Sequence, residues 1–175
     1  QFDGRDLTGF IDGTENPQFP DDRAETALLP EDADEFADGS FIFAQRYAHN
    51  LEKWKKLKVD VQEQVIGRTK LESIELDDDV QPNNSHVSRT VVEDDEGEEM
   101  AILRHSLPYG DGKGDQGLFF IAYTNNLSII DSMLLRMFGT SGDGIHDRLL
   151  HFVTPKDGAY YFAPSEALLE TILES

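Results

Sequence analysis

Residues 117–139 read GLFFIAYTNNLSIIDSMLLRMFG, and they join a strand pattern directly to a helix pattern. The first part, residues 117–123, combines aromatic and β-branched side chains and therefore favours a β-strand. Asn126 is a good N-cap residue, and the apolar residues after it recur at spacings of three and four, as one helix face requires. These apolar residues are Leu127, Ile130, Met133, Leu134 and Met137. Gly139 ends the predicted helix, because glycine readily adopts the left-handed conformation that follows many helices.

The segments before this pair continue the alternation. Residues 40–48 are rich in aromatic and β-forming side chains and predict a strand. Asn50 caps a predicted helix that ends at Gly67. The apolar face of that helix consists of Leu51, Trp54, Leu57, Val61 and Val65. Residues 100–107 predict a further strand, which a Gly- and Asp-rich loop joins to the strand already described.

The C-terminal part predicts a hairpin and a last helix. Residues 149–153 and 159–163 are expected to pair around the turn formed by Pro155 to Gly158. Ser165 then caps a short helix that extends to Leu173. From residue 40 the main order is strand, helix, strand, strand, helix, strand. We therefore predict an α+β, ferredoxin-like split βαβ fold, with an antiparallel sheet covered on one face by two helices and with long functional loops.

Two long polar stretches interrupt this pattern. Residues 1–39 are rich in Gly, Pro and Asp, and we expect an extended loop region with little regular structure. The ferredoxin-like core then occupies residues 40–175, interrupted by a second polar stretch at residues 68–99. Structureless stretches of roughly 30 residues are uncommon in compact domains and are commonly functional. We therefore treat residues 1–175 as one domain in which both loops carry candidate site residues.

Composition restricts the classes of function. The 175 residues include 35 acidic and 15 basic side chains, and the formal net charge is −20. This charge repels phosphate backbones and anionic lipids, so we expect neither nucleic-acid nor membrane binding. No apolar run approaches the ~20 residues that span a bilayer. No signal peptide is visible, and we expect a cytoplasmic location. The first residue is Gln1 rather than Met, so we expect a chain that begins inside a longer parent or after processing.

The sequence contains no cysteine. This absence excludes disulfides, thiolate metal sites, iron–sulfur clusters and thioether attachment of a cofactor. A bound metal must therefore be held through nitrogen or oxygen, and five histidines are available. We expect His49 and His146 at the surface, and His151 on a strand as a structural histidine. His105 follows Arg104 on a predicted strand, so the two side chains face opposite sides of the sheet.

Three residues stand out as candidate site residues. Asp12 lies in the segment GFIDGTENP, residues 9–17, either as a turn residue or as a carboxylate held over a reaction centre. His86 lies in a polar loop, where it is either an exposed histidine or a ligand that the loop presents. Arg104 interrupts an apolar strand, where a guanidinium requires an anion. A salt bridge and a bound anionic group both meet that requirement.

Blocks of sequence spread over nearly the whole chain occur together in one order. They are residues 9–17, residues 45–47 with Trp54, and residues 66–70, 84–87, 102–104 and 136–138. In this combination the chain resembles the C-terminal half of dye-decolourising peroxidases, in particular the shorter bacterial, B-type members. That family has two ferredoxin-like halves, so the resemblance implies that an N-terminal half completes the fold and is absent from this chain. It also implies non-covalently bound haem b and association into a homo-oligomer.

The resemblance implies a role for each candidate. His86 would be the proximal ligand of the haem iron, and Glu99 would supply the carboxylate that bonds its other ring nitrogen. Asp12 would move a proton on the distal side of the haem. Arg104 would stand beside it and stabilise developing negative charge.

The resemblance extends to two more residues and to an activity. Arg68 would meet a haem propionate, and Ser106 stands where some members carry Asn, which would leave the distal pocket wetter. The implied activity is the use of H2O2 to oxidise dyes, phenols or similar bulky reductants. Two other readings remain open. One is a haem-binding or iron-handling module without strong peroxidase activity, and the other is an acidic ferredoxin-like interaction or assembly domain.

Overall fold

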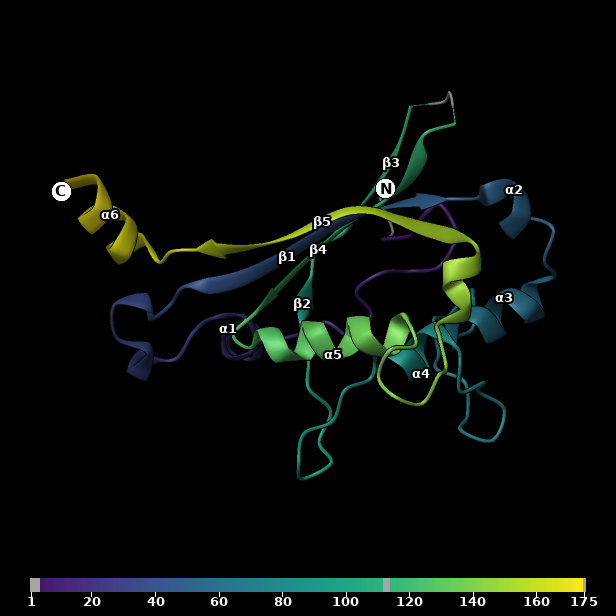
Figure 1. The fold of residues 1–175 in the computed structure, drawn as a ribbon, viewed down its shortest axis with the longest axis horizontal. Helices are drawn as coiled ribbons and strands as arrows, with labels where there is room; N and C mark the ends of the chain where they lie inside the picture. Colours follow the sequence, from purple (N-terminus) through teal and green to yellow (C-terminus); the bar gives the residue numbers. More distant parts are fainter. Residues whose placement is uncertain (1–3, 112–113, 175) are drawn as a thin grey trace.

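A five-stranded antiparallel sheet forms the centre of the computed structural model, which describes residues 4–111 and 114–174 (Figure 1). The strands are β1 (Ser40–His49), β2 (Leu103–Arg104), β3 (Leu107–Gly110), β4 (Gln116–Thr124) and β5 (Val153–Ala163). They lie in the order β2-β4-β1-β5, and β3 also pairs with β4. Phe43 at the centre of β1 lies opposite Ala122 of β4 and Tyr160 of β5. This order and the antiparallel pairing confirm the predicted ferredoxin-like split βαβ fold.

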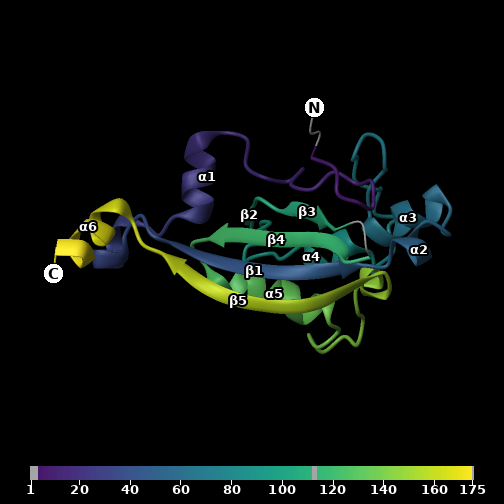
Figure 2. The ribbon, with the colours of Figure 1, turned by 90° about the horizontal axis from the view of Figure 1, so that it is seen from above.

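The helices gather mainly on one face of the sheet. They are α1 (Pro20–Ala27), η1 (Glu31–Phe36), α2 (Leu51–Trp54), α3 (Val59–Ile66), α4 (His86–Thr90), α5 (Leu127–Met137), η2 (Arg148–His151) and α6 (Glu166–Glu174), where η marks a 3-10 helix. Figure 1 shows α3, α4 and α5 below the sheet, and α6 at its far end near the C-terminus. Figure 2 shows α1 beside the edge that carries β2. None of the helices in the described ranges is long and apolar enough to cross a membrane.

The predicted C-terminal hairpin is wrong. Residues 153–163 form one continuous strand, β5, and residues 148–151 form the 3-10 helix η2 instead of a strand. Pro155 and Gly158 resemble turn residues, but β5 lies at the edge of the sheet, where a missing backbone N–H is tolerated. Gly158 lies opposite Gln45, and an ideal Cβ at Gly158 would approach the Gln45 amide nitrogen to 3.0 Å. Gly158 therefore permits close packing between β5 and β1.

The helix predicted from Asn50 to Gly67 is divided into α2 and α3. Asn50 caps α2 as predicted, since its side chain accepts a hydrogen bond from the Lys53 amide. Gln62 of α3 is buried, and its side-chain amide donates to the carbonyl oxygen of Trp54 at 3.1 Å. The same carbonyl also accepts from the Leu57 amide at 3.1 Å, so Gln62 adds a second bond at the break and ties α3 to the end of α2.

Two other predicted segments differ from the structure. The strand predicted over residues 100–107 is divided into β2 and β3. The region 1–39, expected to have little regular structure, contains α1 and η1. Pro20 begins α1, and Asp21 and Asp22 follow it in the first turn. Both features favour a helix start, because proline needs no hydrogen bond there and acidic side chains complement the helix dipole.

Two apolar clusters form the core, and the first of them holds α5 to the sheet. The first consists of Phe43, Ile102, Ala122, Ile129 and Ile130. The second consists of Phe10, Trp54, Val65 and Phe152. Trp54 also donates its indole N–H to the carbonyl oxygen of Thr8 at 3.0 Å, which ties the N-terminal loop to the second cluster. The N-terminal loop is therefore fixed beside the helices.

The opposite face of the sheet is apolar and exposed. Leu107 and Phe119 lie opposite each other on β3 and β4, and both side chains are exposed. Tyr161 of β5 is exposed on the same face, because Tyr161 and Tyr123 both lie opposite Ile42. Within the described ranges, helices cover mainly the other face, which also holds the candidate site.

Candidate functional site

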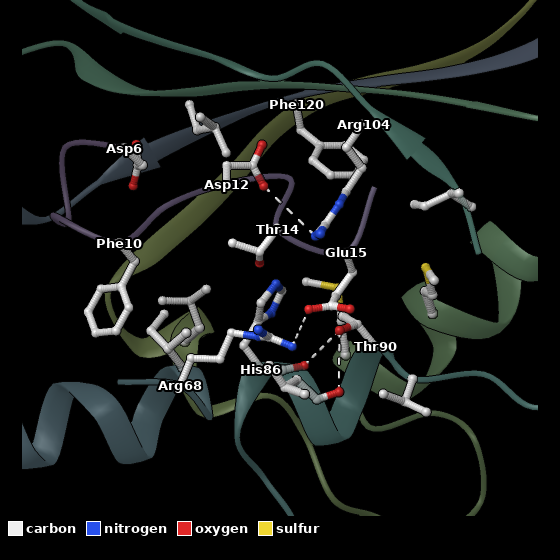
Figure 3. Close-up of a pocket in the computed structure, with 18 of the residues that line it drawn as sticks. Asp6, Phe10, Asp12, Thr14, Glu15, Arg68, His86, Thr90, Arg104 and Phe120 are labelled. Atoms are coloured by element: carbon white, nitrogen blue, oxygen red, sulfur yellow. Dashed lines mark hydrogen bonds and ion pairs between the residues drawn. The ribbon is translucent and has the colours of Figure 1, made fainter. Parts of the chain in front are cut away.

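A cavity of about 220 Å³ lies between the covered face of the sheet and helices α4 and α5. Figure 3 shows its polar side chains converging from the N-terminal loop, from α4 and from the sheet. Of the predicted site residues, Asp12, Arg68, His86, Glu99 and Arg104 line this cavity. Its apolar lining includes Phe10, Phe43, Ile66, Leu118, Phe120, Ile130, Met133, Leu134 and Met137.

His86 is the first residue of α4, whereas the sequence predicted a polar loop. Ser85 is the N-cap of this helix, and its buried hydroxyl accepts a hydrogen bond from the Ser88 amide at 3.1 Å. An ideal Cβ at Gly67 would lie 3.0 Å from the Ser85 hydroxyl oxygen, so α3 packs closely against this cap. The position of His86 is therefore set by a capped helix start.

Asp147, rather than the predicted Glu99, holds the second ring nitrogen of His86. The Nδ1 atom of His86 lies 2.6 Å from Oδ2 of Asp147, whose side chain is 0% exposed. The other carboxylate oxygen accepts a hydrogen bond from the Leu149 amide at 2.7 Å and caps η2. Because a carboxylate accepts at Nδ1, the proton stays on that nitrogen and Nε2 is available to bind a metal ion. Sequence reasoning missed Asp147 because 61 positions separate it from His86.

Asp12 and Arg104 form a looser pair on the other side of the cavity (Figure 3). The Nη1 atom of Arg104 lies 3.8 Å from Oδ1 of Asp12, and their side chains are 21% and 23% exposed. Asn16 joins the two segments: its side chain accepts from the Arg104 amide at 2.9 Å and donates to the Arg104 carbonyl at 2.7 Å. Gly13 has φ +76°, and Asn16 donates its amide to the Gly13 carbonyl at 3.1 Å. Asp12 therefore lies both next to a turn and in the cavity wall.

Arg68 meets anions, and these anions are protein carboxylates. Its Nη2 atom lies 2.5 Å from Oε1 of Glu15 and 2.7 Å from Oε2 of Glu75. Its Nη1 atom donates to the carbonyl oxygen of Ser73 at 2.8 Å. These contacts fix the guanidinium at the cavity wall while both glutamates remain partly exposed to solvent.

Glu99 also lines the cavity but does not bond His86. Burial raises the pKa of the Glu99 carboxyl, and the nearby charges of Glu15 and Glu75 raise it further, against the opposing effect of Arg68. The role predicted for Glu99 is therefore wrong, since Asp147 fills it. Glu99 instead lies near the ion pairs that Arg68 makes with Glu15 and Glu75, here called the Arg68 cluster, and adds a third carboxyl group to it.

Ser106 lines a second cavity of about 170 Å³ that adjoins the first. Four residues line both cavities: Asp6, Asp12, Arg104 and Leu118. The hydroxyl oxygen of Ser106 is buried, and it makes no hydrogen bond within the described residues. Ser106 thus shares the second cavity with Asp12 and Arg104 but does not line the main cavity.

Sequence reasoning also missed a buried acid–histidine pair. His49 was expected at the surface, but its side chain is only 4% exposed, and its Nδ1 atom lies 3.5 Å from Oδ2 of Asp6. Burial lowers the pKa of His49, and the Asp6 charge opposes this effect. Both residues line the main cavity. His146 is exposed as predicted, whereas His151 lies on η2 and is exposed instead of buried in a strand.

The donor set of the main cavity fits the haem that the resemblance implies. An imidazole nitrogen is available on one side, and a carboxylate and a guanidinium lie on the other (Figure 3). Apolar side chains from the sheet and α5 line the space between them, as a flat apolar macrocycle requires. Arg68 supplies a cation of the kind that pairs with the carboxylates of haem.

Comparison with known proteins gives consistent matches over nearly the whole chain. The family model described as "Dyp-type peroxidase, C-terminal" matches residues 3–168. Dye-decolorizing peroxidases from Mycobacterium tuberculosis and Rhodococcus erythropolis are 44% and 42% identical over 170 residues, or 97% of this chain. The match covers 50% of each relative, so the chain spans about half the length of these curated relatives.

Solved structures match equally well. DyPB from Rhodococcus jostii RHA1 has a TM-score of 0.92 and 45% sequence identity, with 98% of this chain and 55% of that chain covered. A dye-decolorizing protein from Vibrio cholerae has a TM-score of 0.90 and 48% identity, with the same coverage. A variant of the Rhodococcus jostii protein was solved in complex with heme, and it is 45% identical with a TM-score of 0.91. That match covers 97% of this chain and 55% of the variant's chain.

Proposed function

Because the chain belongs to the family of Dyp-type peroxidase C-terminal domains, we propose that it is the haem-binding part of a peroxidase. The proposed enzyme uses H2O2 to oxidise dyes, phenols or similar bulky reductants. One observation carries the proposal: His86 faces one side of an apolar cavity, and the Asp12–Arg104 pair lies on the other side. Haem, when bound, supplies the iron that binds peroxide and accepts the oxidising equivalents.

His86 is proposed to hold the haem iron through Nε2. The 2.6 Å bond between its Nδ1 and the buried Asp147 supports this role, because it fixes the ring and its tautomer. A carboxylate partner also makes the imidazole a stronger electron donor. The capped start of α4 adds to the rigidity of the ligand.

Asp12 and Arg104 are proposed to handle the peroxide. Cleavage of the peroxide bond requires one proton to move from one oxygen to the other, and the Asp12 carboxylate is suited to accept and return it. Arg104 lies 3.8 Å from Asp12 and carries the permanent charge needed to stabilise negative charge on the leaving oxygen. The partial exposure of both side chains supports exchange of protons with solvent.

Arg68 is proposed to bind a haem propionate in competition with Glu15 and Glu75. Its guanidinium already pairs with two carboxylates at the cavity wall, which supports its use as an anion site. Ser106 is proposed to influence the distal side indirectly, through the adjoining cavity that it shares with Asp12 and Arg104.

The part of the fold that this chain does not span is proposed to cover the exposed sheet face. Leu107, Phe119 and Tyr161 leave apolar surface on that face, and the relatives are about twice as long as the match. Association into a homo-oligomer remains a prediction from the family resemblance. If this face is covered in the full-length protein, Phe119→Lys should lower the melting temperature of that protein. An unchanged melting temperature would argue against the proposal.

The proposed function is tested by an absorption titration with haemin, followed by H2O2 and a dye. We expect a saturable Soret band in the wild-type chain, its loss in His86→Ala, and its retention in the control His105→Ala. Peroxide should then change the spectrum of the wild-type chain and drive dye oxidation. A Soret band without reaction to peroxide would favour the haem-binding module. The absence of any saturable band, both in this chain and in the full-length protein, would favour the interaction domain.

A further inference from the structure

Two exposed histidines face each other at the surface, outside both cavities. The Nε2 atoms of His146 and His151 lie 3.0 Å apart, and their ring centroids are separated by 5.2 Å. Both side chains are exposed to solvent, so a dissolved ion reaches them directly. The mechanism proposed for the cavity uses neither residue.

The backbone around this pair is held from both sides. Two consecutive backbone amides just after His146 donate to carbonyls of different segments: Asp147 to Met137 at 2.8 Å, and Arg148 to Asn84 at 2.9 Å. His151 ends the 3-10 helix that starts after Asp147, so a short, capped turn separates the two histidines. The imidazoles therefore converge without further folding of the chain, which lowers the entropy lost when both bind one ligand.

Gly139 contributes to the same arrangement. It has φ +71°, and an ideal Cβ there would lie 3.1 Å from Cβ of His146. The end of α5 thus packs directly against the His146 backbone. A larger residue at this position would displace the segment that carries the first imidazole.

We propose that His146 and His151 form a two-imidazole site for a divalent transition-metal ion such as Zn²⁺, Ni²⁺ or Cu²⁺. Neutral imidazole is a preferred ligand of all three ions. With Zn–N bonds of 2.0–2.1 Å, tetrahedral geometry places two ligand nitrogens about 3.3 Å apart. The present 3.0 Å separation is that of an N–H···N hydrogen bond between the two rings. Metal binding breaks this bond, shifts the proton of the donor ring to its Nδ1 atom, and requires only a small tilt of two exposed rings.

The surroundings define the kind of site. Within the described ranges, no group of three or more His, Asp or Glu side chains is arranged to hold a metal ion, so water completes the coordination. The net charge of −20 attracts cations to the whole surface. The affinity is expected to follow the usual order, with Cu²⁺ above Ni²⁺ and Zn²⁺, and to fall in acid as protons compete for the imidazoles.

The first test is residue-resolved and needs no variant. The untagged chain is treated with diethyl pyrocarbonate with and without ZnCl2 at pH 7.5, and modified histidines are identified by mass spectrometry. We expect Zn²⁺ to protect His146 and His151 together, and to leave the exposed His105 as reactive as before. Protection of only one of the pair, or equal protection of His105, would overturn the proposal.

The second test measures affinity by calorimetric titration with ZnCl2. His146→Ala and His151→Ala are each expected to weaken Zn²⁺ binding at least about tenfold. With one imidazole removed, the ion is held by a single ligand and the gain from two ligands on one scaffold is lost. The control His105→Ala should keep the wild-type affinity, and circular dichroism checks that every variant is folded. A variant that carries both His146→Ala and His151→Ala should lose the site. Binding at full affinity in this double variant, or no saturable binding in the wild-type chain, would refute the proposal.

Discussion

The two sides of the main cavity are held with different rigidity. On the His86 side, the key contact is 2.6 Å long, Asp147 is fully buried although His86 is 27% exposed, and both carboxylate oxygens have partners. On the Asp12 side, the contact with Arg104 is 3.8 Å long, and both side chains are partly exposed. A group that positions an axial ligand must stay fixed, whereas a group that carries protons must exchange them. The difference in rigidity therefore matches the different roles proposed for the two sides.

The largest expected effect is a loss of catalytic turnover on the Asp12 side, with almost no loss of stability. Asp12→Asn removes the group that accepts and returns a proton, so peroxide-driven dye oxidation should fall by on the order of 10² to 10³-fold. The free energy of unfolding should change by less than about 0.5 kcal/mol, because the side chain is partly exposed. Steady-state kinetics and urea unfolding measure the two effects, with the exposed Asp78→Asn as control. Turnover within threefold of the wild type would assign the proton transfer to another residue.

The second prediction concerns the rigid side. Asp147→Ala leaves the His86 ring N–H without its buried partner and removes the cap of η2. We expect the free energy of unfolding to fall by about 3 kcal/mol. Urea denaturation followed by circular dichroism measures this loss, and Asp78→Ala controls for removal of an exposed carboxylate. A loss below about 1 kcal/mol would mean that the two sides are equally tolerant, and the contrast would disappear.

A third prediction concerns Asn16, which joins the loop that carries Asp12 to the strand that carries Arg104. Asn16 makes two hydrogen bonds to the backbone of Arg104, and Asn16→Ala removes both. We expect a loss of about 1–2 kcal/mol in the free energy of unfolding. Because the loop that carries Asp12 is then less well positioned, turnover should fall more than haem affinity. The exposed Asn83→Ala serves as control, and equal losses in both variants would show that Asn16 has no special role.

The smallest expected effect is on thermal stability, and it concerns Glu99 in the Arg68 cluster. The raised pKa of Glu99 means that the folded state holds its proton more tightly than the unfolded state, so ionisation at neutral pH reduces stability. Glu99→Gln should therefore raise the melting temperature by about 1–2 °C at pH 7.5. The gain should shrink as the pH falls toward the ordinary carboxyl value of 4.5. Thermal melts at pH 4 and pH 7.5 test this, and an equal gain at both values would contradict the raised pKa.

Local patterns predicted much of the fold. The segment 117–139 forms β4 and α5, and Asn126 caps α5 by accepting from the Ser128 amide at 3.0 Å. The prediction failed where local and long-range preferences conflict. Residues 155–158 have the composition of a turn, but pairing with β1 over nine positions keeps β5 extended. The choice between these outcomes depends on a distant strand that no local pattern describes.

The candidate site divides in the same way. Asp12, Arg68, His86 and Arg104 came from short blocks with family resemblance, and the structure brings all four to one cavity. Their individual roles stay predictions. Asp147 escaped notice because a single Asp in a polar loop carries no local sign of burial. The same holds for Asp6 and His49, whose contact joins two segments that the sequence treats as independent.

The contact between Trp54 and Thr8 has an optical consequence. This indole is the only one in the chain, it is 2% exposed, and it packs edge-on against Phe10 and Phe152. Its fluorescence should therefore be blue-shifted while the N-terminal loop is docked, and should shift to the red when the loop detaches. Phe10 also lines the cavity, so any strongly absorbing group bound there lies near enough to quench the emission. The chain thus contains its own label, and loop docking and cofactor loading can be followed in one cuvette without any added dye.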